Sequence, residues 1–274
     1  MDILIIIFVA FVLDLVFGAP DWLPHPAKGI GFMAEKLEAP FKKNIRKARL
    51  AGAFFTAAII ALSLFFALFL IYLAGRTNPF LSFALSIFFI YAALSVRDMD
   101  IKARGVYDRV KEGNLKAARA ELAKIIGRKA SAPGESEIAG AVVEAAAVNT
   151  VTGAASPLFF AFIGGAPLAV AYLAVSALGS IARLKTKKQK DFGWFSMQLD
   201  DAVNYIPARI AGVMLTAAAF VYGANTRCSW AILKRDRKNS PDINNGYPVS
   251  AVAGALGIKL ATYGPGKIVV FSIG

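Results

Sequence analysis

Long apolar runs alternate with shorter polar and basic segments along this chain, and the two longest predict membrane-spanning helices. Residues 51–74 (AGAFFTAAIIALSLFFALFLIYLA) and 79–96 (PFLSFALSIFFIYAALSV) contain no charged side chain. At a rise of about 1.5 Å per residue, a helix over either run crosses most or all of a hydrocarbon core ~30 Å thick. The GRTN segment between them predicts a tight turn, so residues 51–96 are expected to form a helical hairpin.

The N-terminal apolar run is interrupted by a single acid. ILIIIFVAFVLDLVFG, residues 3–18, contains Asp14 and lacks both the basic flank and the small-residue cleavage site of a signal peptide. We therefore expect a helical anchor over residues 1–20. An acid near the end of a span is costly, so Asp14 either has a role or reaches the interface.

Two later apolar segments are also interrupted, within a region of broken apolar helices at residues 154–224. GGAP breaks the first of them, and Arg209 lies in the second. Each segment either spans fully or forms a broken or re-entrant helix, which a membrane tolerates only where protein or a cavity covers the freed backbone.

The polar pattern changes to helical amphipathicity over residues 97–153. DRVKEGNLKAARAELAKII has apolar residues near a 3.6 period, with Gly113 and Asn114 marking a break, and GESEIAGAVVEAAAVN predicts a second helix. This stretch is expected to be a soluble helical insert, and residues 225–274 a basic C-terminal loop region. With no strand alternation, the predicted fold is all-α: a polytopic helical integral membrane protein with a soluble helical insert, in one membrane-embedded domain over residues 1–274.

Composition strengthens the membrane assignment and narrows the chemistry. The 274 residues are 57% hydrophobic and carry a formal net charge of +13, with one cysteine and one histidine. Those two counts exclude an internal disulfide framework and the usual Cys/His zinc site. The basic excess fits nucleic acid, anionic lipid or an anionic substrate. In a multi-pass protein it is typical of basic cytoplasmic loops, which is the interpretation we favour.

The single histidine lies in an unusually stiff segment. Pro24 and Pro26 disfavour helix at the residues before them, so DWLPHP predicts an extended connector that places His25 before a helix at residues 27–38. His25 is either structural or, with Lys28 one turn away, a group for anion binding or proton transfer.

Three further motifs carry candidate chemistry. In VNTVTGAASPLFF, Ser156 and Pro157 predict a helix start. Either this motif only begins a helix, or the free backbone N–H groups near Asn149, Thr150 and Gly153 face a phosphate. In KDFGWFSMQLDDAVNYIPARI, Asp200 and Asn204 share one helical face beside a stripe of Asp201, Tyr205 and Arg209. This is either an exposed helix start or a Mg²⁺ site. KRDRKNSPDINNGYP is a solvated loop or a phosphate-capturing one, through Arg235, Arg237 and Lys238.

Taken together and in order, these segments resemble the adenosylcobinamide-phosphate synthase family, the CobD/CbiB membrane proteins of cobalamin biosynthesis. The matching stretches cover nearly the whole chain and are LDLVFGAPDWLPHPAKGIG, LSVRDM, VYDRVKEGNLKAARAELAKIIGRKA, EIAGAVVEAAAVNTVTGAASPLFFAFIGGAPLAVAY, KDFGWFSMQLDDAVNYIPARI and RDRKNSPDINNGYPVSAVAGALG.

The resemblance implies an ATP-dependent amide ligation at the cell membrane. Adenosylcobyric acid, a corrin, would be joined to aminopropanol or its phosphate, with ATP and Mg²⁺ forming an acyl phosphate that the amine attacks. The implied partners are these substrates, the lipid bilayer and other late cobalamin-pathway membrane enzymes, with no nucleic acid. The catalytic candidates are His25, Asp191, Asp200 and Asp201, of which Asp200 and Asp201 would also hold Mg²⁺. The substrate- and phosphate-binding candidates are Lys28, Arg97, Asn149, Thr150, Ser156, Asn204, Arg209, Arg235, Lys238 and Asn245.

Most departures of the chain from the family pattern replace an acidic residue by a neutral or basic one. Positions where the family pattern has an acid are occupied by Val148, Thr152, Gly179, Val249, Lys129 and Lys187; Ser176 replaces an Asn, and SPNAG is expanded to SPDINNG. Three hypotheses follow: an active synthase, a catalytically degenerate member that binds corrin or phosphate as an assembly partner, and an unrelated transporter or lipid-facing use of the scaffold. The retained basic residues favour the first two.

Overall fold

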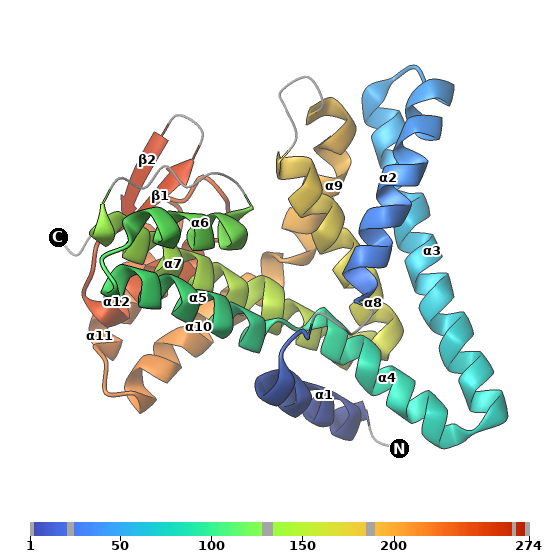
Figure 1. Ribbon diagram of the computed structural model, residues 1–274, viewed down its shortest axis with the longest axis horizontal. Coiled ribbons are helices and arrows are strands. Elements are labelled where there is room, and N and C mark those ends of the chain that lie inside the picture. The colour runs from blue at the N-terminus through green and yellow to red at the C-terminus, as the bar shows by residue number, and fades with distance from the viewer. Residues whose placement is uncertain (1–2, 21–24, 128–133, 185–189, 265–266, 272–274) are drawn as a thin grey trace. The chain divides into compact units, whose positions relative to one another are not determined.

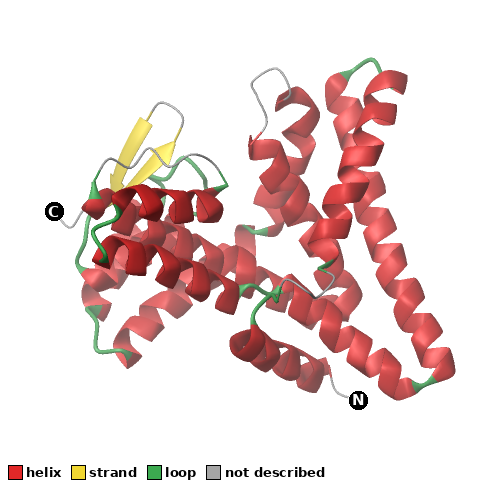
Figure 2. Ribbon diagram, in the orientation of Figure 1, coloured by secondary structure: helices red, strands yellow, loops and turns green. Residues whose placement is uncertain are grey.

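The computed structural model describes residues 3–20, 25–127, 134–184, 190–264 and 267–271, with the side chains described up to Leu260. Helices make up almost all of this part of the chain, so the all-α prediction is confirmed (Figure 2). The chain forms two compact units, each built from two separate segments: residues 1–97 with 156–203, and residues 98–155 with 204–274. The predicted single membrane-embedded domain stays a prediction.

The first unit is a bundle in which the long helix α3 packs against α2, α4, α8 and α9 (Figure 1). Phe55, Ile59 and Leu178 fill its core between α3 and α8, and Ile90 and Val170 belong to a second cluster that includes α1. Its helices are α1 (Ile3–Phe17), α2 (Pro26–Asn44), α3 (Ala48–Thr77), α4 (Pro79–Ala93), α8 (Ser156–Leu184) and α9 (Lys190–Val203).

The second unit combines three helices from residues 96–150 with helices from the C-terminal part of the chain. Val106, Leu122 and Ile138 pack α5, α6 and α7 together, and α12 packs against α7, α10 and α11. Its elements are α5 (Val96–Lys111), α6 (Leu115–Ile126), α7 (Glu135–Thr150), the π-helical turn η1 (Val151–Ala155), α10 (Tyr205–Val221), α11 (Thr226–Asp236), α12 (Gly246–Leu256), β1 (Leu260–Gly264) and β2 (Lys267–Phe271).

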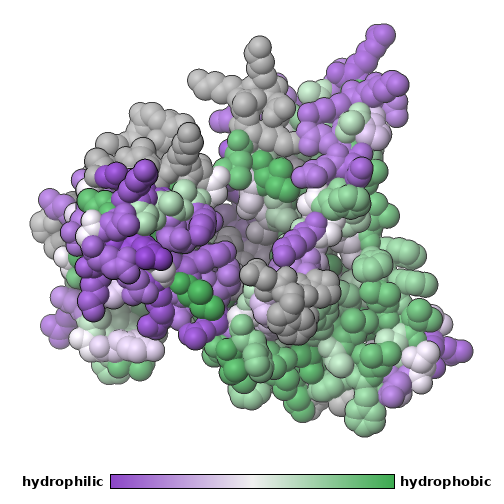
Figure 3. Space-filling model, viewed as in Figure 1, coloured by the Kyte–Doolittle hydropathy of each residue, from purple (hydrophilic) through white to green (hydrophobic). Residues whose placement is uncertain are grey.

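Three helical stretches in the described chain are long and apolar enough to cross a membrane. They are Ala48–Thr77, Pro79–Lys111 and Glu135–Leu184; the pair Lys190–Val203 and Tyr205–Val221, bent by 45°, would make a fourth. On α3 large apolar side chains such as Phe65, Phe66 and Tyr72 are exposed. Figure 3 shows the apolar surface of the first unit gathered over α1, α3 and α4, with hydrophilic side chains where α2 meets α3. An apolar exterior of this size is what a lipid-facing bundle requires.

The predicted hairpin is present, but its turn is shorter than expected. Helix α3 continues through Gly75–Thr77, and Asn78 alone separates it from α4. The Asn78 side chain accepts a hydrogen bond from the Phe80 N–H at 2.8 Å, and Pro79 occupies the first helical position. A good N-cap followed by proline starts α4 at once, so no longer loop is needed.

Two expected helix breaks are present, and one helix is longer than expected. Gly164 and Gly165 adopt non-helical angles inside α8, with φ of 67° at Gly165, which confirms the GGAP break. Gly113 and Asn114 separate α5 from α6 as predicted. Helix α2 runs six residues beyond the predicted end at Glu38, through Pro40 to Asn44.

The predicted helix start at Ser156 is the first residue of α8, but the chain before it is already helical. Helix α7 passes through the π-helical turn of η1 directly into α8, so Ser156 and Pro157 lie inside a continuous helical path and are buried. Asn149 and Thr150 form the last turn of α7. A π-turn absorbs an extra residue without ending the helix, so this stretch does not present the N–H groups of a fresh helix end.

Asp14 has a structural role that the sequence left open. It is 1% exposed, and its Oδ2 accepts hydrogen bonds from the backbone N–H of Val96 at 2.9 Å and of Arg97 at 3.4 Å. These N–H groups begin α5 and have no partner within that helix. The buried carboxylate therefore caps a helix start, which explains an acid in an otherwise apolar run.

The C-terminal region is not the loop region that we expected. Thr226–Asp236 forms α11, Gly246–Leu256 forms α12, and Leu260–Gly264 pairs antiparallel with Lys267–Phe271. These two strands are the only departure from helix, turn or loop in the described residues. Charge density led us to expect a loop, but the apolar positions Ile232, Leu233 and Val249 are buried and hold the two helices in place.

The contact between α3 and α9 leads to the first prediction. A Cβ at Gly52 would overlap the backbone carbonyl oxygen of Phe192, which a helix cannot move cheaply. We expect Gly52→Ala to destabilise the protein by about 1–3 kcal/mol and to lower its unfolding temperature in detergent. Gly31→Ala is the matched control, because nothing lies within 4 Å of a Cβ there, and it should leave that temperature unchanged or raised. Equal temperatures for the two variants would contradict this packing.

Candidate functional site

The predicted site residues fall into two groups, one in each unit. The first unit holds His25, Lys28, Arg97, Ser156, Asp191, Asp200 and Asp201, and the second holds Asn149, Thr150, Asn204, Arg209, Arg235, Lys238 and Asn245. We describe the two groups separately.

Asp200 and Asp201 are joined by one guanidinium group from the neighbouring helix. Nη1 of Arg183, near the end of α8, lies 2.5 Å from Oδ2 of Asp200, and Nη2 lies 2.5 Å from Oδ1 of Asp201. The Asp200 side chain is only 6% exposed, whereas those of Asp201 and Arg183 are 33% and 35% exposed. The sequence did not single out Arg183, because α8 and α9 meet only in the folded bundle.

Gly179, where we expect the family to have an acid, lies directly beside this cluster. A Cβ built on Gly179 would be 2.6 Å from Cβ of Asp200 and 2.9 Å from its Oδ2. An aspartate at position 179 would therefore need Asp200 to move, and it would add a negative charge beside Asp200. Glycine at this position allows α9 to approach α8 and Asp200 to reach Arg183.

The pair does not fit a direct Mg²⁺ site as it stands. Both carboxylates accept hydrogen bonds from the Arg183 guanidinium, which neutralises part of their charge. No group of three or more His, Cys, Asp or Glu side chains in the described residues is arranged to hold a metal. Mg²⁺ is usually held by one or two carboxylates and by substrate phosphates. Assignment of Mg²⁺ to Asp200 and Asp201 stays a prediction.

His25 caps a helix. Its Nδ1 accepts a hydrogen bond from the Ala27 N–H at 3.2 Å, and its carbonyl accepts one from Lys28, so α2 begins directly after it. The proton of the neutral ring is therefore on Nε2. His25 also lines a small cavity with Gly18 and Tyr91. The residues 21–24 of the predicted stiff connector lie outside the described part of the chain.

The remaining predicted residues of the first unit are apart from the Arg183 cluster. Asp191 begins α9 and forms an exposed ion pair with Arg49 at 3.0 Å. Lys28 is exposed in the first turn of α2, and Arg97 donates its backbone N–H to Asp14.

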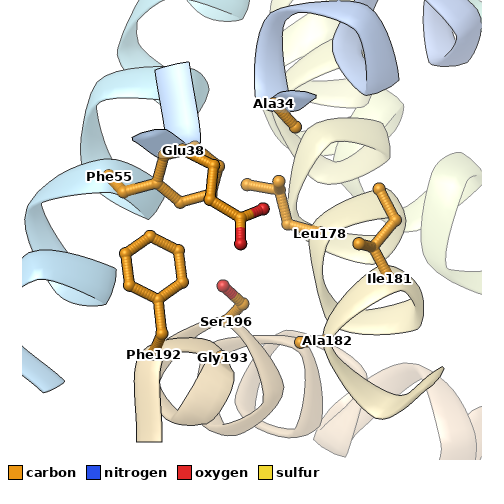
Figure 4. A pocket seen from close by; sticks show the side chains of 9 residues that line it. All are labelled: Ala34, Glu38, Phe55, Leu178, Ile181, Ala182, Phe192, Gly193 and Ser196. Atoms are coloured by element: carbon orange, nitrogen blue, oxygen red, sulfur yellow. The ribbon is translucent and has the colours of Figure 1, made fainter. Parts of the chain in front are cut away.

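A small cavity opens between four helices of the first unit, and the sequence did not predict it. It is lined by Ala34, Glu38, Phe55, Leu178, Ile181, Ala182, Phe192, Gly193 and Ser196. Figure 4 shows the carboxylate of Glu38 pointing toward the hydroxyl of Ser196 across this space. Glu38 also pairs with Lys42 at 2.6 Å. The sequence of α2 shows only an ordinary i,i+4 ion pair on a helix surface. The cavity beside Glu38 exists only because α9 packs against this part of the bundle.

In the second unit Arg209 is held between two aromatic rings. Its Cζ lies 3.2 Å from the ring centre of Tyr205 and 4.5 Å from that of Tyr247, and Nη1 donates to the Tyr205 carbonyl. Tyr205 begins α10 and Tyr247 is the second residue of α12. The guanidinium therefore lies near two helix N-termini, where partial positive charge already favours an anion.

The loop before α12 is organised by Asp242. Its Oδ1 accepts hydrogen bonds from the backbone N–H groups of Asn244 at 2.9 Å and Asn245 at 3.3 Å. Arg235 makes a two-bond pair with the buried Asp236, and these hydrogen bonds raise the pKa of Arg235 above its already high usual value. Lys238 is exposed beside this loop.

Asn204 separates α9 from α10 at the 45° bend, which interrupts the continuous Asp201–Tyr205–Arg209 stripe that we expected. The side chain of Asn204 is buried. Asn149 and Thr150 are half-buried on α7, and the Thr150 hydroxyl donates to the Ala146 carbonyl at 3.2 Å.

Comparison with known proteins shows which family this chain belongs to. A sequence model of the CobD/Cbib protein family matches residues 7–267. The chain belongs to the CobD/CbiB family. Proteins called "Cobalamin biosynthesis protein CobD" are similar to it: that of Clostridium perfringens is 39% identical over 96% of this chain and 84% of its own length, and that of Leptospira interrogans is 37% identical over 93% and 81%. One from Geobacter metallireducens is 36% identical over 93% and 80%. No solved structure matches.

The positions at which we expect a family acid are spread over both units. Gly179 adjoins Asp200, whereas Val148 is half-buried at the end of α7, Thr152 lies in η1 and Val249 is buried in α12. The CobD/CbiB positions occupied by Lys129 and Lys187 lie outside the described residues. The replacements are therefore not confined to one surface.

Proposed function

We propose that this protein is a membrane-bound enzyme of cobalamin biosynthesis that forms an amide from adenosylcobyric acid and aminopropanol or its phosphate. The family match over residues 7–267 carries the proposal. The apolar helices support a multi-pass location in the cell membrane, and the basic segments at residues 42–49, 97–129, 183–190 and 234–238 support cytoplasmic loops.

The proposed reaction needs activation of a poor electrophile. A carboxylate oxygen of the corrin attacks the γ-phosphorus of ATP, giving an acyl phosphate and ADP. The amine nitrogen then attacks the acyl carbon, the C–O bond to phosphate breaks, and the nitrogen loses a proton to leave an amide and inorganic phosphate. Mg²⁺ accompanies ATP and shields its phosphates.

The chain's own residues would bind these anions and keep water away. In the second unit Arg209, with its rings and two helix N-termini, is the strongest anion-binding group, and the exposed Lys238 adds positive potential. Arg235 and Asn245 are weaker candidates, because Arg235 pairs with Asp236 and the Asn245 N–H donates to Asp242. In the first unit Lys28 and Arg97 are the corresponding candidates. Preorganised donors of this kind stabilise charge that develops on phosphoryl oxygens.

A second candidate function is a catalytically degenerate family member that binds corrin or phosphate as an assembly partner. The specific observation in its favour is at α8 and α9: Gly179 stands where the family pattern has an acid, and Arg183 neutralises the two remaining acids. Loss of a positioned acid or base costs about 10²–10⁴ in rate, so this difference matters.

One assay separates the two candidates. The protein in detergent is incubated with adenosylcobyric acid, ATP, Mg²⁺ and either aminopropanol or its phosphate, and the amide is sought by mass spectrometry. We expect product that depends on ATP and Mg²⁺. Corrin binding without product would favour the degenerate member, and neither binding nor product would contradict both.

His25 allows a second prediction, because its capping role can be preserved. Asparagine is a good N-cap but does not titrate near neutral pH. We expect His25→Asn to unfold at the wild-type temperature and to turn over at least about tenfold more slowly. His25→Ala should lose about 1 kcal/mol of stability as well. Wild-type turnover of the Asn variant would limit His25 to capping α2.

A further inference from the structure

Positive charge is concentrated where α2 connects to α3, at one end of the first unit. Residues 42–49 (KKNIRKAR), called the basic turn below, contain five basic side chains and no acid. The start of α9 lies at the same end, because Asp191 pairs with Arg49, and the exposed Lys190 directly precedes it (Figure 1). The turn at the opposite end of α3 carries a single charged side chain, that of Arg76. The two ends of this bundle therefore differ strongly in charge.

Three of the five basic side chains in the basic turn are not neutralised. The first and the last pair with acids of α2 and α9. Lys43, Arg46 and Lys47 are exposed and form no ion pair with an acid in the described part of the chain. Ile45 lies between them and packs against the core cluster of α2, α3, α8 and α9, which holds the turn in place. Like charges held close together attract an anion that compensates them.

Apolar side chains that face outward begin directly after these charges. Leu50 and Phe54, four residues apart on one face of α3, are both exposed, and the same face continues to Phe65. Trp194 of α9 is exposed as well, and the Cζ of Arg49 lies 5.5 Å from its ring centre. An exposed tryptophan at the end of an apolar span is typical of the headgroup level of a bilayer. The basic turn therefore lies where lipid phosphates lie.

The neighbourhood of charge and apolar surface selects the kind of ligand. Water and salt weaken the attraction of exposed basic side chains for a small soluble anion. A nucleic acid would use the charges but not the adjoining apolar face. An anionic phospholipid uses both, and its acyl chains keep its phosphate at a high local concentration beside the turn. Each Lys or Arg near an anionic membrane surface strengthens binding about fivefold.

We propose that the basic turn binds the headgroup of an anionic phospholipid. The lipid phosphate contacts Lys43, Arg46 and Lys47, and the acyl chains lie along Leu50 and Phe54 of α3. This site holds the basic end of the first unit at the leaflet that contains anionic lipid. It rests on the membrane location in the proposed function, but on neither the substrates nor the reaction.

The test follows the fluorescence of one tryptophan in lipid vesicles. Trp22→Phe and Trp230→Phe leave Trp194 as the only tryptophan of the full chain. This protein is reconstituted in phosphatidylcholine vesicles that contain increasing fractions of brominated phosphatidylglycerol, or of brominated phosphatidylcholine as the neutral comparison. We expect the brominated anionic lipid to quench Trp194 with a saturating dependence and with at least about fivefold preference over the neutral lipid.

Neutral side chains in the basic turn should remove this preference. The triple variant Lys43→Gln, Arg46→Gln, Lys47→Gln should quench equally with both lipids. Arg76→Gln, at the other end of α3, is the matched control and should keep the preference. Inorganic phosphate should not reverse the quenching, because it lacks the acyl chains. The proposal is overturned if the two lipids quench the parent protein equally, if the triple variant keeps the preference, if quenching rises without saturation, or if inorganic phosphate displaces the lipid.

A second measurement needs no tryptophan substitution. In detergent, added phosphatidylglycerol should raise the unfolding temperature of the wild type, because a ligand of the folded state stabilises it, and phosphatidylcholine should not. The triple variant should show no such rise. Equal rises with the two lipids, or an equal rise in the triple variant, would contradict the site.

Failure of the lipid site is separable from failure of the proposed function. A wild-type chain that floats with neutral vesicles but shows no preference for anionic lipid would contradict the site and leave the membrane location standing. A chain that does not float with vesicles would contradict the membrane location. Anionic-lipid preference without amide product would leave the site standing and contradict the synthase.

Discussion

Replacement of Arg183 by methionine is expected to cost about 2–3 kcal/mol of stability, the largest stability effect among the charged substitutions considered. The reason is that Asp200, 6% exposed, would lose the cation that neutralises its charge in the interior of the α8–α9 contact. Removing one partner of a fully buried pair costs roughly 3–5 kcal/mol, and we lower this because Arg183 is 35% exposed. The unfolding temperature in detergent should fall by about 5–10 °C.

A double variant tests this explanation. Arg183→Met combined with Asp200→Asn removes the buried negative charge together with the cation that neutralises it, so it should recover more than half of the lost temperature. Arg49→Met is the matched control, because its pair with Asp191 is exposed on both sides and should contribute less than about 1 kcal/mol. If the double variant is no more stable than the single one, the destabilisation has a source other than Asp200.

The largest effect on activity is expected at Arg209. Arg209→Met should lower kcat/KM of the proposed ligation by about 10²-fold, because one preorganised donor to a phosphoryl oxygen is removed. Arg209→Lys should lose nearly as much, since lysine keeps the charge but cannot stack its planar group between Tyr205 and Tyr247. The measurement is initial rate of amide formation against ATP concentration.

Arg227→Met, an exposed arginine of α11, is the control and should leave the rate unchanged. The unfolding temperature of both Arg209 variants separates a binding role from a packing role. Full activity of Arg209→Lys would show that charge alone matters there, and full activity of Arg209→Met would place the anion site elsewhere.

Local patterns predicted most of the helices but few of their contacts. The uncharged runs placed α3 and α4, the 3.6-residue periodicity placed α5, α6 and α7, and GGAP placed the break in α8. These features depend on neighbouring residues, so one sequence is enough to predict them. The π-turn at Val151–Ala155 was missed, because Ser-Pro is also a good helix start and only the helix on either side shows that it continues.

For the same reason the sequence did not predict the contacts of the candidate site. Composition and charge pattern by themselves determined a basic, multi-pass helical protein, and the ordered motifs determined its family. Only the tertiary structure decided that Asp14 caps α5, that Arg183 joins Asp200 to Asp201, that Tyr205 and Tyr247 enclose Arg209, and that Glu38 faces Ser196. Apart from the contact of Tyr205 with Arg209 within α10, each of these contacts joins residues from different helices or turns. Which faces meet depends on close packing around small residues such as Gly52 and Gly179, and a linear pattern of hydrophobic and polar positions does not contain that information.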